Sequence, residues 1–316
     1  MGSIDKEVLD VVMVGAGPAA LTAAIYTCRE DIKTVLYEKG VIGGLAAITD
    51  WVDNYPGFPD GIAGLDLAEA LRKQAERFGA DIRLGDVMDI TDEGDYKKMV
   101  TTDGEVLAKT VLIATGSDYK KLGIPGEQEY YARGVHYCAT CDGAFYRDKR
   151  LVVIGGGNSA VQESLFLTRY AAHIDLIVRS TLKASEILQN ELKKHSDKIT
   201  VHLGIKPHEI VATDNIVTSV RAENIKGEEV SFETDGVFVF IGLLPNTQFL
   251  QAKIDLDEVG MIKTDNNLET SMKGVFAAGD VRSGATMQIA SASGEGATAA
   301  LMIRKYLEAL EQSAAA

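Results

Sequence analysis

Two stretches of the chain repeat one pattern of hydrophobic and polar positions. Each begins with a short run of apolar and β-branched residues, passes through a glycine-rich turn into a run with helical spacing, and ends in a second apolar run. The first copy covers residues 9–38 and the second covers residues 150–179. A strand, a tight turn, a helix and a second strand make up a βαβ unit. The pattern therefore predicts an α/β protein with two doubly wound, Rossmann-like dinucleotide-binding domains.

The connections around these copies predict that one domain is inserted into the other. Connectors that contain Gly and Pro occupy residues 116–134 and 242–246. The segment that follows has no complete βαβ unit of its own, so it is expected to complete the first domain. Its predicted elements are strands at 261–263 and 275–278 and a helix at 289–310. We predict a discontinuous domain of residues 1–120 and 246–316, with residues 121–245 as the second domain.

Composition and charge exclude several classes of protein. Hydrophobic residues make up 46% of the chain and charged residues 25%, which is the balance of an ordinary globular protein. The longest apolar runs are the length of a strand, far short of the ~20 residues of a membrane helix. The first residues do not form a signal-peptide pattern, so we expect a cytoplasmic protein without a membrane anchor. The formal net charge of −14 argues against nucleic-acid binding, since phosphate contacts need a basic face.

The three cysteines fall into two groups. Cys28 lies in an apolar helical stretch and is expected to be a small buried residue. Cys138 and Cys141 have the spacing of redox-active disulfides. A structural zinc site is the main alternative, but it needs about four ligands, and His136 is the one His within a few residues, so no metal is expected. Asp142, which follows the second cysteine of this pair, is either a plain turn residue or a carboxyl group placed to move protons.

The first glycine turn suits the pyrophosphate of a dinucleotide. Gly15 permits the tight turn, Gly17 lets the backbone approach the ligand, and Ala20 keeps the helix close to the strand. The start of the helix supplies amide donors and the positive end of its dipole. Glu38, at the tip of the second strand, is placed to accept hydrogen bonds from ribose hydroxyls.

The second glycine turn makes the same argument independently, with a different strand tip. Gly155, Gly157 and Ala160 repeat the spacing of the first turn. No carboxylate ends the second strand. The polar residues at that tip are instead Arg179, Ser180 and Lys183. They are either ordinary loop residues or a site for the 2′-phosphate of NADPH.

Two dinucleotide sites in one chain imply two dinucleotides. FAD in one and a nicotinamide nucleotide in the other is the simplest pairing, because a flavin accepts hydride and passes the electrons on. Asp280, directly after an apolar strand, is consistent with a carboxylate that contacts the ribityl or phosphate region of FAD.

Three motifs carry a resemblance that covers essentially the whole chain. They are Cys-Ala-Thr-Cys-Asp-Gly at 138–143, Gly-Gly-Gly-Asn-Ser-Ala at 155–160 and Val-Phe-Ala-Ala-Gly-Asp-Val at 275–281. With these motifs the sequence resembles the low-molecular-weight, bacterial-type thioredoxin reductases, class II members of the pyridine nucleotide-disulfide oxidoreductase family. The resemblance implies a homodimeric thioredoxin-disulfide reductase. Its electrons would pass from NADPH through FAD and the Cys138–Cys141 disulfide to thioredoxin or a thioredoxin-like protein.

The resemblance also implies roles for individual residues. Cys141 would be the thiol nearer the flavin, Cys138 would attack the partner disulfide, and Asp142 would be the acid–base group. The implied FAD contacts are Gly15, Gly17, Pro18, Ala19, Glu38, Gly43, Gly44, Leu45, Asn54, Val87, Ala114, Thr115, Gly116, Gly279, Asp280, Gln288, Ile289 and Ala290. The implied nicotinamide-nucleotide contacts are Gly155, Gly157, Asn158, Ser159, Ala160, Arg179, Ser180 and Lys183.

Departures from the family pattern leave the donor and the acceptor open. NADPH-dependent members usually carry His-Arg-Arg-x-x-x-Arg after the second strand, whereas this chain keeps Arg179 and has Ser180 after it. Leu45 replaces a usual Gln, and Ala144 stands where an aromatic residue is common. A flavoprotein that uses NADH, ferredoxin or another donor, or that acts on a different dithiol or disulfide, is the alternative. A non-catalytic nucleotide sensor is disfavoured because the dithiol is intact.

Overall fold

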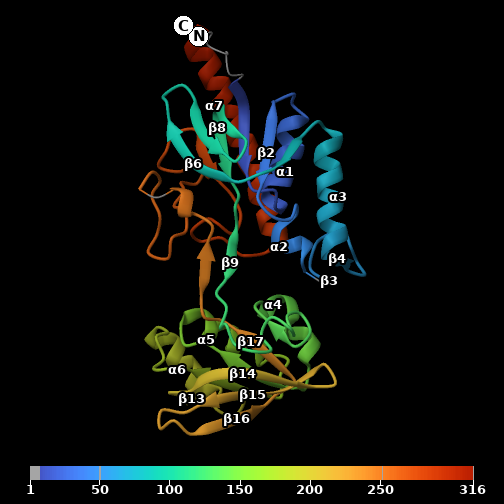
Figure 1. Ribbon diagram of the computed structural model, residues 1–316, viewed down its shortest axis with the longest axis vertical. Helices are drawn as coiled ribbons and strands as arrows, with labels where there is room; N and C mark the ends of the chain where they lie inside the picture. The colour runs from blue at the N-terminus through green and yellow to red at the C-terminus, as the bar shows by residue number, and fades with distance from the viewer. Residues whose placement is uncertain (1–7, 50, 251, 316) are drawn as a thin grey trace. The chain divides into compact units, whose positions relative to one another are not determined.

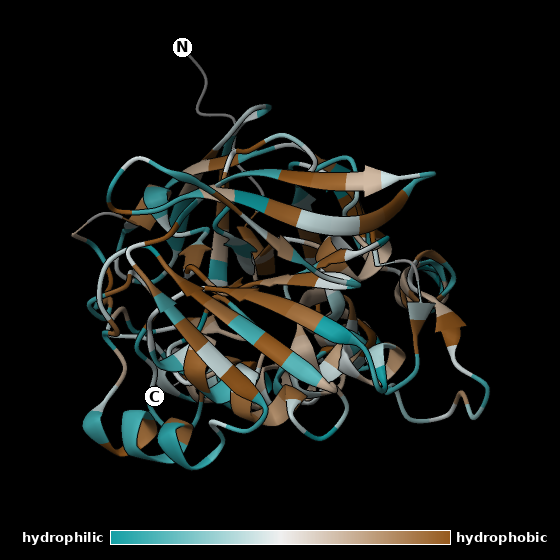
Figure 2. Ribbon diagram, turned by 90° about the horizontal axis from the view of Figure 1, so that it is seen from below, coloured by the Kyte–Doolittle hydropathy of each residue, from teal (hydrophilic) through white to brown (hydrophobic). Residues whose placement is uncertain are grey.

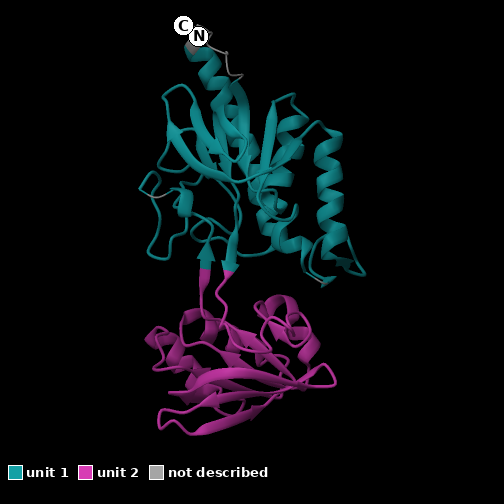
Figure 3. Ribbon diagram, in the orientation of Figure 1, with its two compact units in different colours: residues 1–118, 244–316 teal, residues 119–243 magenta. Residues whose placement is uncertain are grey.

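The chain folds into two compact units. The computed structural model describes residues 8–49, 51–250 and 252–315. Unit 1 comprises residues 1–118 and 244–316, and unit 2 comprises residues 119–243 (Figure 3). The chain passes between them through β9 (Ser117–Tyr119) and β18 (Leu243–Pro245), which pair with each other. In the described part of the chain, no helix is long and apolar enough to cross a membrane.

Unit 1 is built on a seven-stranded sheet. The strand order is β5-β2-β1-β8-β7-β6, and β19 pairs with β8 (Figure 1). The strands are β1 (Val8–Val14), β2 (Thr34–Glu38), β5 (Asp81–Leu84), β6 (Val87–Asp92), β7 (Lys97–Thr101), β8 (Gly104–Ile113) and β19 (Val275–Ala277). Strands β1, β2, β5, β8 and β19 pair in parallel, while β6 and β7 extend the sheet as an antiparallel hairpin. The parallel part confirms the predicted α/β class.

Alternate residues of β1 face opposite sides of this sheet, and both sides are covered. Val11 and Met13 belong to a core shared with the helices. Val12 and Val14 belong to a second core, formed with β6–β8 and the segment after β18. Burial on both faces explains why β1 is apolar almost throughout.

The remaining elements of unit 1 are α1 (Pro18–Cys28), α2 (Gly44–Ala47), β3 (Trp51–Val52), β4 (Ile62–Ala63), α3 (Gly64–Arg77), the 3₁₀ turn η2 (Gln248–Leu250) and α7 (Ile289–Ala315).

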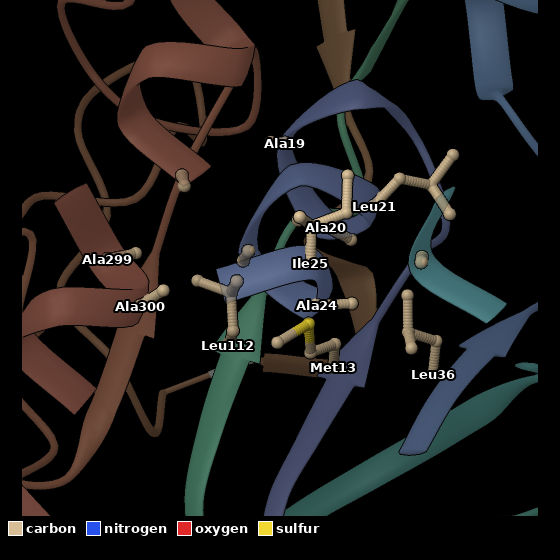
Figure 4. Close-up of a cluster of buried hydrophobic side chains, with 14 of the residues drawn as sticks. Met13, Ala19, Ala20, Leu21, Ala24, Ile25, Leu36, Leu112, Ala299 and Ala300 are labelled. Carbon is tan, nitrogen blue, oxygen red and sulfur yellow. The ribbon is translucent and has the colours of Figure 1, made fainter. Parts of the chain in front are cut away.

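Helices α1 and α7 pack closely because small residues line their contact. Figure 4 shows Ala20 and Ala24 of α1 and Ala299 and Ala300 of α7 near Met13, Leu36 and Leu112 of the sheet. A Cβ atom added at Gly296 would lie 2.1 Å from the carbonyl oxygen of Ala19. A larger residue at that point of α7 would therefore push the two helices apart.

Unit 2 has a five-stranded parallel sheet between helices and a second sheet. Its order is β10-β17-β11-β12-β13. The strands are β10 (Val135–His136), β11 (Arg150–Ile154), β12 (His173–Val178), β13 (Ile199–Leu203) and β17 (Gly236–Val239). One face packs against α5 (Asn158–Leu167) and α6 (Glu186–Lys194). The other face packs against the antiparallel strands β14 (Lys206–Thr213), β15 (Ile216–Glu223) and β16 (Glu229–Glu233). Figure 2 shows hydrophobic and hydrophilic residues alternating along the strands nearest to the viewer.

Two details of the C-terminal segment differ from the prediction. Residues 261–263 do not form a strand, and Ile262 makes only isolated bridges to Leu256 and Arg282. The prediction of a strand was wrong because Asp257 accepts a hydrogen bond from the amide of Met261 at 2.9 Å, which closes a turn. Helix α7 continues to Ala315, past its predicted end at residue 310.

Gly296→Ala is expected to lower the thermal midpoint of unfolding. Its methyl group would meet the Ala19 carbonyl, and overpacking of this kind costs about 1–3 kcal/mol. Gly294→Ala is the matched control, because no described atom lies within 4 Å of a Cβ there, and Ala gains up to ~1 kcal/mol over Gly in a helix. Circular dichroism during heating measures both. A Gly296→Ala protein as stable as the control would contradict the packing described above.

Candidate active site

The first glycine turn closes β1 against β2 and β8 and leaves the start of α1 accessible. The amide of Gly15 donates to the carbonyl of Tyr37 at 2.7 Å. Gly15 has φ 99°, and a Cβ on it would lie 2.5 Å from the carbonyl oxygen of Ala114. At Gly17, by contrast, a Cβ would meet no described atom within 4 Å. Gly17 caps α1 without a side-chain hydrogen bond from the described residues, so amides at the helix start remain free for an anion such as a pyrophosphate.

Glu38 lies beside this turn, as the spacing predicts. Its Oε2 accepts a hydrogen bond from the amide of Ala16 at 2.7 Å, and its Oε1 accepts one from Gly40 at 2.8 Å. The carboxylate is therefore fixed at the tip of β2, against the backbone of the glycine turn. In this position its remaining lone pairs can accept hydroxyl groups of a ribose.

A cavity of about 350 Å³ opens next to Glu38 within unit 1. Its lining includes Gly15, Glu38, Val87 and Thr115, which come from four separate segments. In one wall, Thr115 Oγ1 donates to the backbone carbonyl of Asn246 at 2.8 Å, and the backbone carbonyl of Thr115 accepts from Asn246 Nδ2 at 3.1 Å. The cavity begins at Gly15 of the glycine turn and has space for a ribose and a base.

Other predicted residues of unit 1 contact the same turn, the helix that follows it, or one another. The amide of Gly43 donates to the carbonyl of Ala16 at 2.8 Å. A Cβ on Gly279 would lie 3.1 Å from that of Ala19. Asn54 Nδ2 donates to Gln288 Oε1 at 3.0 Å across 234 positions of sequence. The rest of the predicted set lies at the first turns of α1, α2 and α7, just after β8, or in the segment after β19: Pro18, Gly44, Leu45, Ile289, Ala290, Ala114, Gly116 and Asp280.

Asp280 is the most perturbed carboxyl group of this region. Burial raises its pKa to about 6, and the nearby carboxylate of Glu295 contributes to the rise. Glu295 itself accepts the amide of Gly279 at 2.8 Å and pairs with Arg282 at 2.6 Å. A buried carboxyl group of this kind prefers to be protonated or to accept hydrogen bonds from a polar ligand.

The glycine turn of unit 2 has the same construction. Gly155 donates to the carbonyl of Ile177 at 3.0 Å, and a Cβ on it would lie 2.3 Å from the carbonyl oxygen of Phe240. No described atom lies within 4 Å of a Cβ on Gly157. Ala160 is buried under the turn, while Asn158 and Ser159 are exposed at the start of α5.

The loop after β12 folds back onto this second turn. The amide of Lys183 donates to the carbonyl of Gly156 at 2.7 Å, and the amide of Ser185 donates to Asn158 Oδ1 at 2.8 Å. Arg179, Ser180 and Lys183 are exposed. The loop thus carries two cations on the surface beside the turn.

Cys138 and Cys141 form a disulfide in unit 2, with 5.3 Å between their Cα atoms. Cys138 precedes the short helix α4 (Ala139–Asp142), and its Sγ accepts a hydrogen bond from the amide of Cys141 at 3.1 Å. Asp142 ends that helix, and its Oδ2 lies 3.2 Å from Nδ1 of His136. Within the described residues, no group of three or more His, Cys, Asp or Glu side chains is arranged to hold a metal ion.

Comparison with known proteins identifies the family. A family model described as pyridine nucleotide-disulphide oxidoreductase matches residues 9–296. The chain belongs to this family. It is 40% identical over 311 residues to a thioredoxin reductase of Bacillus subtilis (strain 168), which covers 98% of both proteins.

Solved structures extend the similarity to the fold of this oxidoreductase. A thioredoxin reductase from Streptococcus pyogenes MGAS5005 is 40% identical with a TM-score of 0.90, over 96% of this chain and 99% of that one. A thioredoxin reductase from Giardia duodenalis is 32% identical with a TM-score of 0.90, over 96% of this chain and 100% of that one. The predicted resemblance to bacterial-type thioredoxin reductases is confirmed, as is the prediction of an oxidoreductase.

Sequence reasoning missed part of the oxidoreductase's cavity and one neighbour of the dithiol. The cavity residues absent from the predicted site are Val14, Tyr37, Lys39, Gly85, Asp86, Met88, Asn246, Gln248 and Phe249. Asn246 lies within the predicted connector at 242–246, and the others lack a motif that marks them. His136 was considered only as a possible zinc ligand. Cys28 is free and buried, as expected.

Asp280→Asn is expected to stabilise the cofactor-free oxidoreductase at pH 7.5 but not near pH 4. Because the folded state raises the pKa of this carboxyl to about 6, the folded state binds the proton more tightly than the unfolded state. Stability is therefore lost as pH rises from about 4 to 6, by at most roughly 3 kcal/mol. The amide resembles the neutral acid and avoids that loss. Thermal midpoints of both proteins across this range measure it, with the exposed Asp60→Asn as control. A benefit that is equal at both pH values would contradict the assignment.

Proposed function

We propose that this chain is a thioredoxin-disulfide reductase with NADPH as electron donor, FAD as resident cofactor and the Cys138–Cys141 disulfide as its redox centre. The observation that carries the proposal is this disulfide, held in the unit that also bears the second glycine turn. Family membership and full-length similarity to thioredoxin reductases support it. A homodimer and a thioredoxin or thioredoxin-like partner are part of the same proposal.

The residues of unit 1 fit FAD. The free amides at Gly17 are suited to the pyrophosphate, and Glu38 is suited to a ribose beside the 350 Å³ cavity. Asn54, Asp280 and the start of α7 would hold the remainder of the cofactor. When bound, FAD supplies hydride acceptance and transfer of an electron pair.

The dithiol chemistry follows from Cys138, Cys141 and Asp142. Once the disulfide is reduced, the Cys138 thiolate attacks a sulfur of the partner disulfide, forms a mixed disulfide and releases one partner thiolate. The Cys141 thiolate then attacks Cys138 Sγ, which restores the enzyme disulfide and releases the second partner thiolate. The two protons of the enzyme dithiol leave with the partner dithiol, and Asp142 is the group that carries them. The amide of Cys141 donates to Cys138 Sγ, so it stabilises the thiolate that attacks.

The tip of β12 supports NADPH as donor and also favours a second candidate. Arg179 and Lys183 are two exposed cations beside the second glycine turn, where a 2′-phosphate would bind. Ser180 between them adds a hydroxyl in place of a further cation. NADH, or a donor other than a pyridine nucleotide, is the second candidate on that observation.

Cys138→Ser is expected to abolish thioredoxin reduction, by about a thousandfold or more, because it removes the attacking thiol. The purified protein is mixed anaerobically with NADPH or NADH, and flavin absorbance and thioredoxin thiols are recorded. Flavin bleaching by nucleotide should survive in the variant. Cys28→Ala, at the buried free cysteine, should keep full turnover. Thioredoxin turnover by Cys138→Ser would rule out the assigned role, and a wild-type flavin that only dithionite bleaches would rule out both nucleotides as donors.

Ser180→Arg is expected to raise the ratio of kcat/KM for NADPH over NADH by roughly tenfold, since one added guanidinium–phosphate contact is worth about 1.4 kcal/mol. Thr213→Arg adds the same charge at the exposed end of β14 and should leave the ratio unchanged. An unchanged ratio in Ser180→Arg would mean that the tip of β12 does not meet the 2′-phosphate.

A further inference from the structure

Asp142, His136 and Tyr146 lie in series beside the disulfide. His136 Nδ1 is 3.2 Å from Asp142 Oδ2, and His136 Nε2 is 2.7 Å from the Tyr146 hydroxyl. His136 ends β10 and is 6% exposed, and Tyr146 ends the 3₁₀ turn η1 (Gly143–Tyr146). Both ring nitrogens of a buried imidazole are therefore engaged, one of them by the carboxyl group next to Cys141.

The surroundings fix the orientation of this imidazole. Its ring stacks on Phe238 of β17 with 5.1 Å between centroids, and Tyr146 meets the same phenyl ring edge-on at 5.6 Å. His136 also meets the Tyr146 ring edge-on at 5.3 Å. Because Phe238, Tyr146 and Asp142 all contact this ring, it cannot turn to exchange its two nitrogens without disturbing the core of unit 2.

The same contacts fix its tautomer. Burial raises the pKa of the Tyr146 hydroxyl, and the carboxylates of Asp142 and Asp235 raise it further, so the phenol keeps its proton. The Asp142 carboxylate beside Nδ1 can only accept a hydrogen bond, so the ring proton lies on Nδ1 and the phenol donates to Nε2 of His136. That N–H donates to Asp142 Oδ2.

We propose that His136 is a positioning residue for Asp142, an inference that rests on the proposed dithiol function. Its Nδ1–H holds one carboxylate oxygen and disperses the negative charge beside the cysteine pair. A thiol proton then moves to the Asp142 carboxylate as the thiolate forms, and passes from there to the first thiolate released by the partner. His136 keeps its own proton throughout. Once Asp142 has passed the proton on, it is again a carboxylate, and without the N–H its charge repels the neighbouring thiolate more strongly.

Other ionisable groups around the series must be counted in any pH dependence. Burial raises the pKa of Tyr131, and the carboxylate of Asp142 raises it further. Asp235, in the turn before β17, acts on Tyr146 and lies 3.5 Å from Lys149. These groups are unchanged in the variants below, so a shift between variants reports on the series itself.

The test uses three substitutions. His136→Leu removes the donor to Asp142. His136→Asn keeps an amide N–H near the position of Nδ1 and loses the link to Tyr146. Tyr146→Phe removes one hydroxyl and frees the tautomer, and it serves if His136→Leu does not fold. His208→Leu, at an exposed histidine of β14, is the matched control.

Each protein is reduced with dithiothreitol, desalted anaerobically and alkylated with iodoacetamide between about pH 5 and 8. In His136→Leu the half-maximal alkylation of the dithiol should move to higher pH, and Tyr146→Phe should move in the same direction by less. His136→Asn and His208→Leu should match the wild type. A second measurement mixes the same reduced proteins with oxidised bacterial thioredoxin, where His136→Leu should be slower by roughly tenfold near neutral pH.

The outcomes separate the two proposals. If alkylation of His136→Leu and Tyr146→Phe follows the wild-type profile, or if His136→Asn shifts as far as His136→Leu, the positioning role is wrong. If the wild-type dithiol leaves thioredoxin oxidised, the proposed function is wrong, while the alkylation profiles still decide the role of His136.

Discussion

The backbone of the first glycine turn is the junction on which unit 1 depends. Gly15 donates to Tyr37 of β2, and its Cα lies too close to the Ala114 carbonyl for any side chain. Ala16 donates to Glu38 and accepts from Gly43. One turn therefore joins both neighbouring strands, the carboxylate at a strand tip and the loop before α2. Because these bonds occupy the backbone of residues 15–16, the amides that remain free are those at the start of α1, which is where an anion can bind.

The two units use one scaffold with opposite charges at the strand tip. In unit 1 the tip of β2 carries Glu38, fixed by two backbone amides. In unit 2 the tip of β12 carries Arg179 and Lys183 on a loop tied to the turn by the amide of Lys183. A carboxylate accepts ribose hydroxyls, whereas cations favour a phosphate. Under the proposed function, the duplicated geometry would set where a dinucleotide lies, and the strand-tip residue would set which one is preferred.

The features that were predicted from the sequence are those that depend on residues close together along the chain. Both βαβ units, the place of Glu38 and the disulfide follow from short spacings, because turns and helix starts depend on nearby residues. The partnership of Asn54 with Gln288 spans 234 positions, and Met88 and Phe249 meet in one cavity through packing that no spacing encodes. The strand predicted at 261–263 failed because Asp257 closes a turn with backbone amides there. A hydrogen bond between a side chain and a nearby backbone amide can override the strand that an apolar pattern predicts.

The role proposed for His136 could not be predicted from the sequence either, because it depends on the side chains that pack around the imidazole. The imidazole is placed by Phe238 and Tyr146, and it touches Asp142 rather than a metal. Cys138, Cys141 and these four side chains all belong to unit 2. The polar contacts of His136 are with Tyr146 and Asp142 and involve no residue of the loop at Arg179–Lys183. Under the proposed function, substitutions at the exposed residues of that loop are expected to change the electron donor without altering the thiol chemistry. We therefore expect donor preference and disulfide exchange to respond to different substitutions in unit 2.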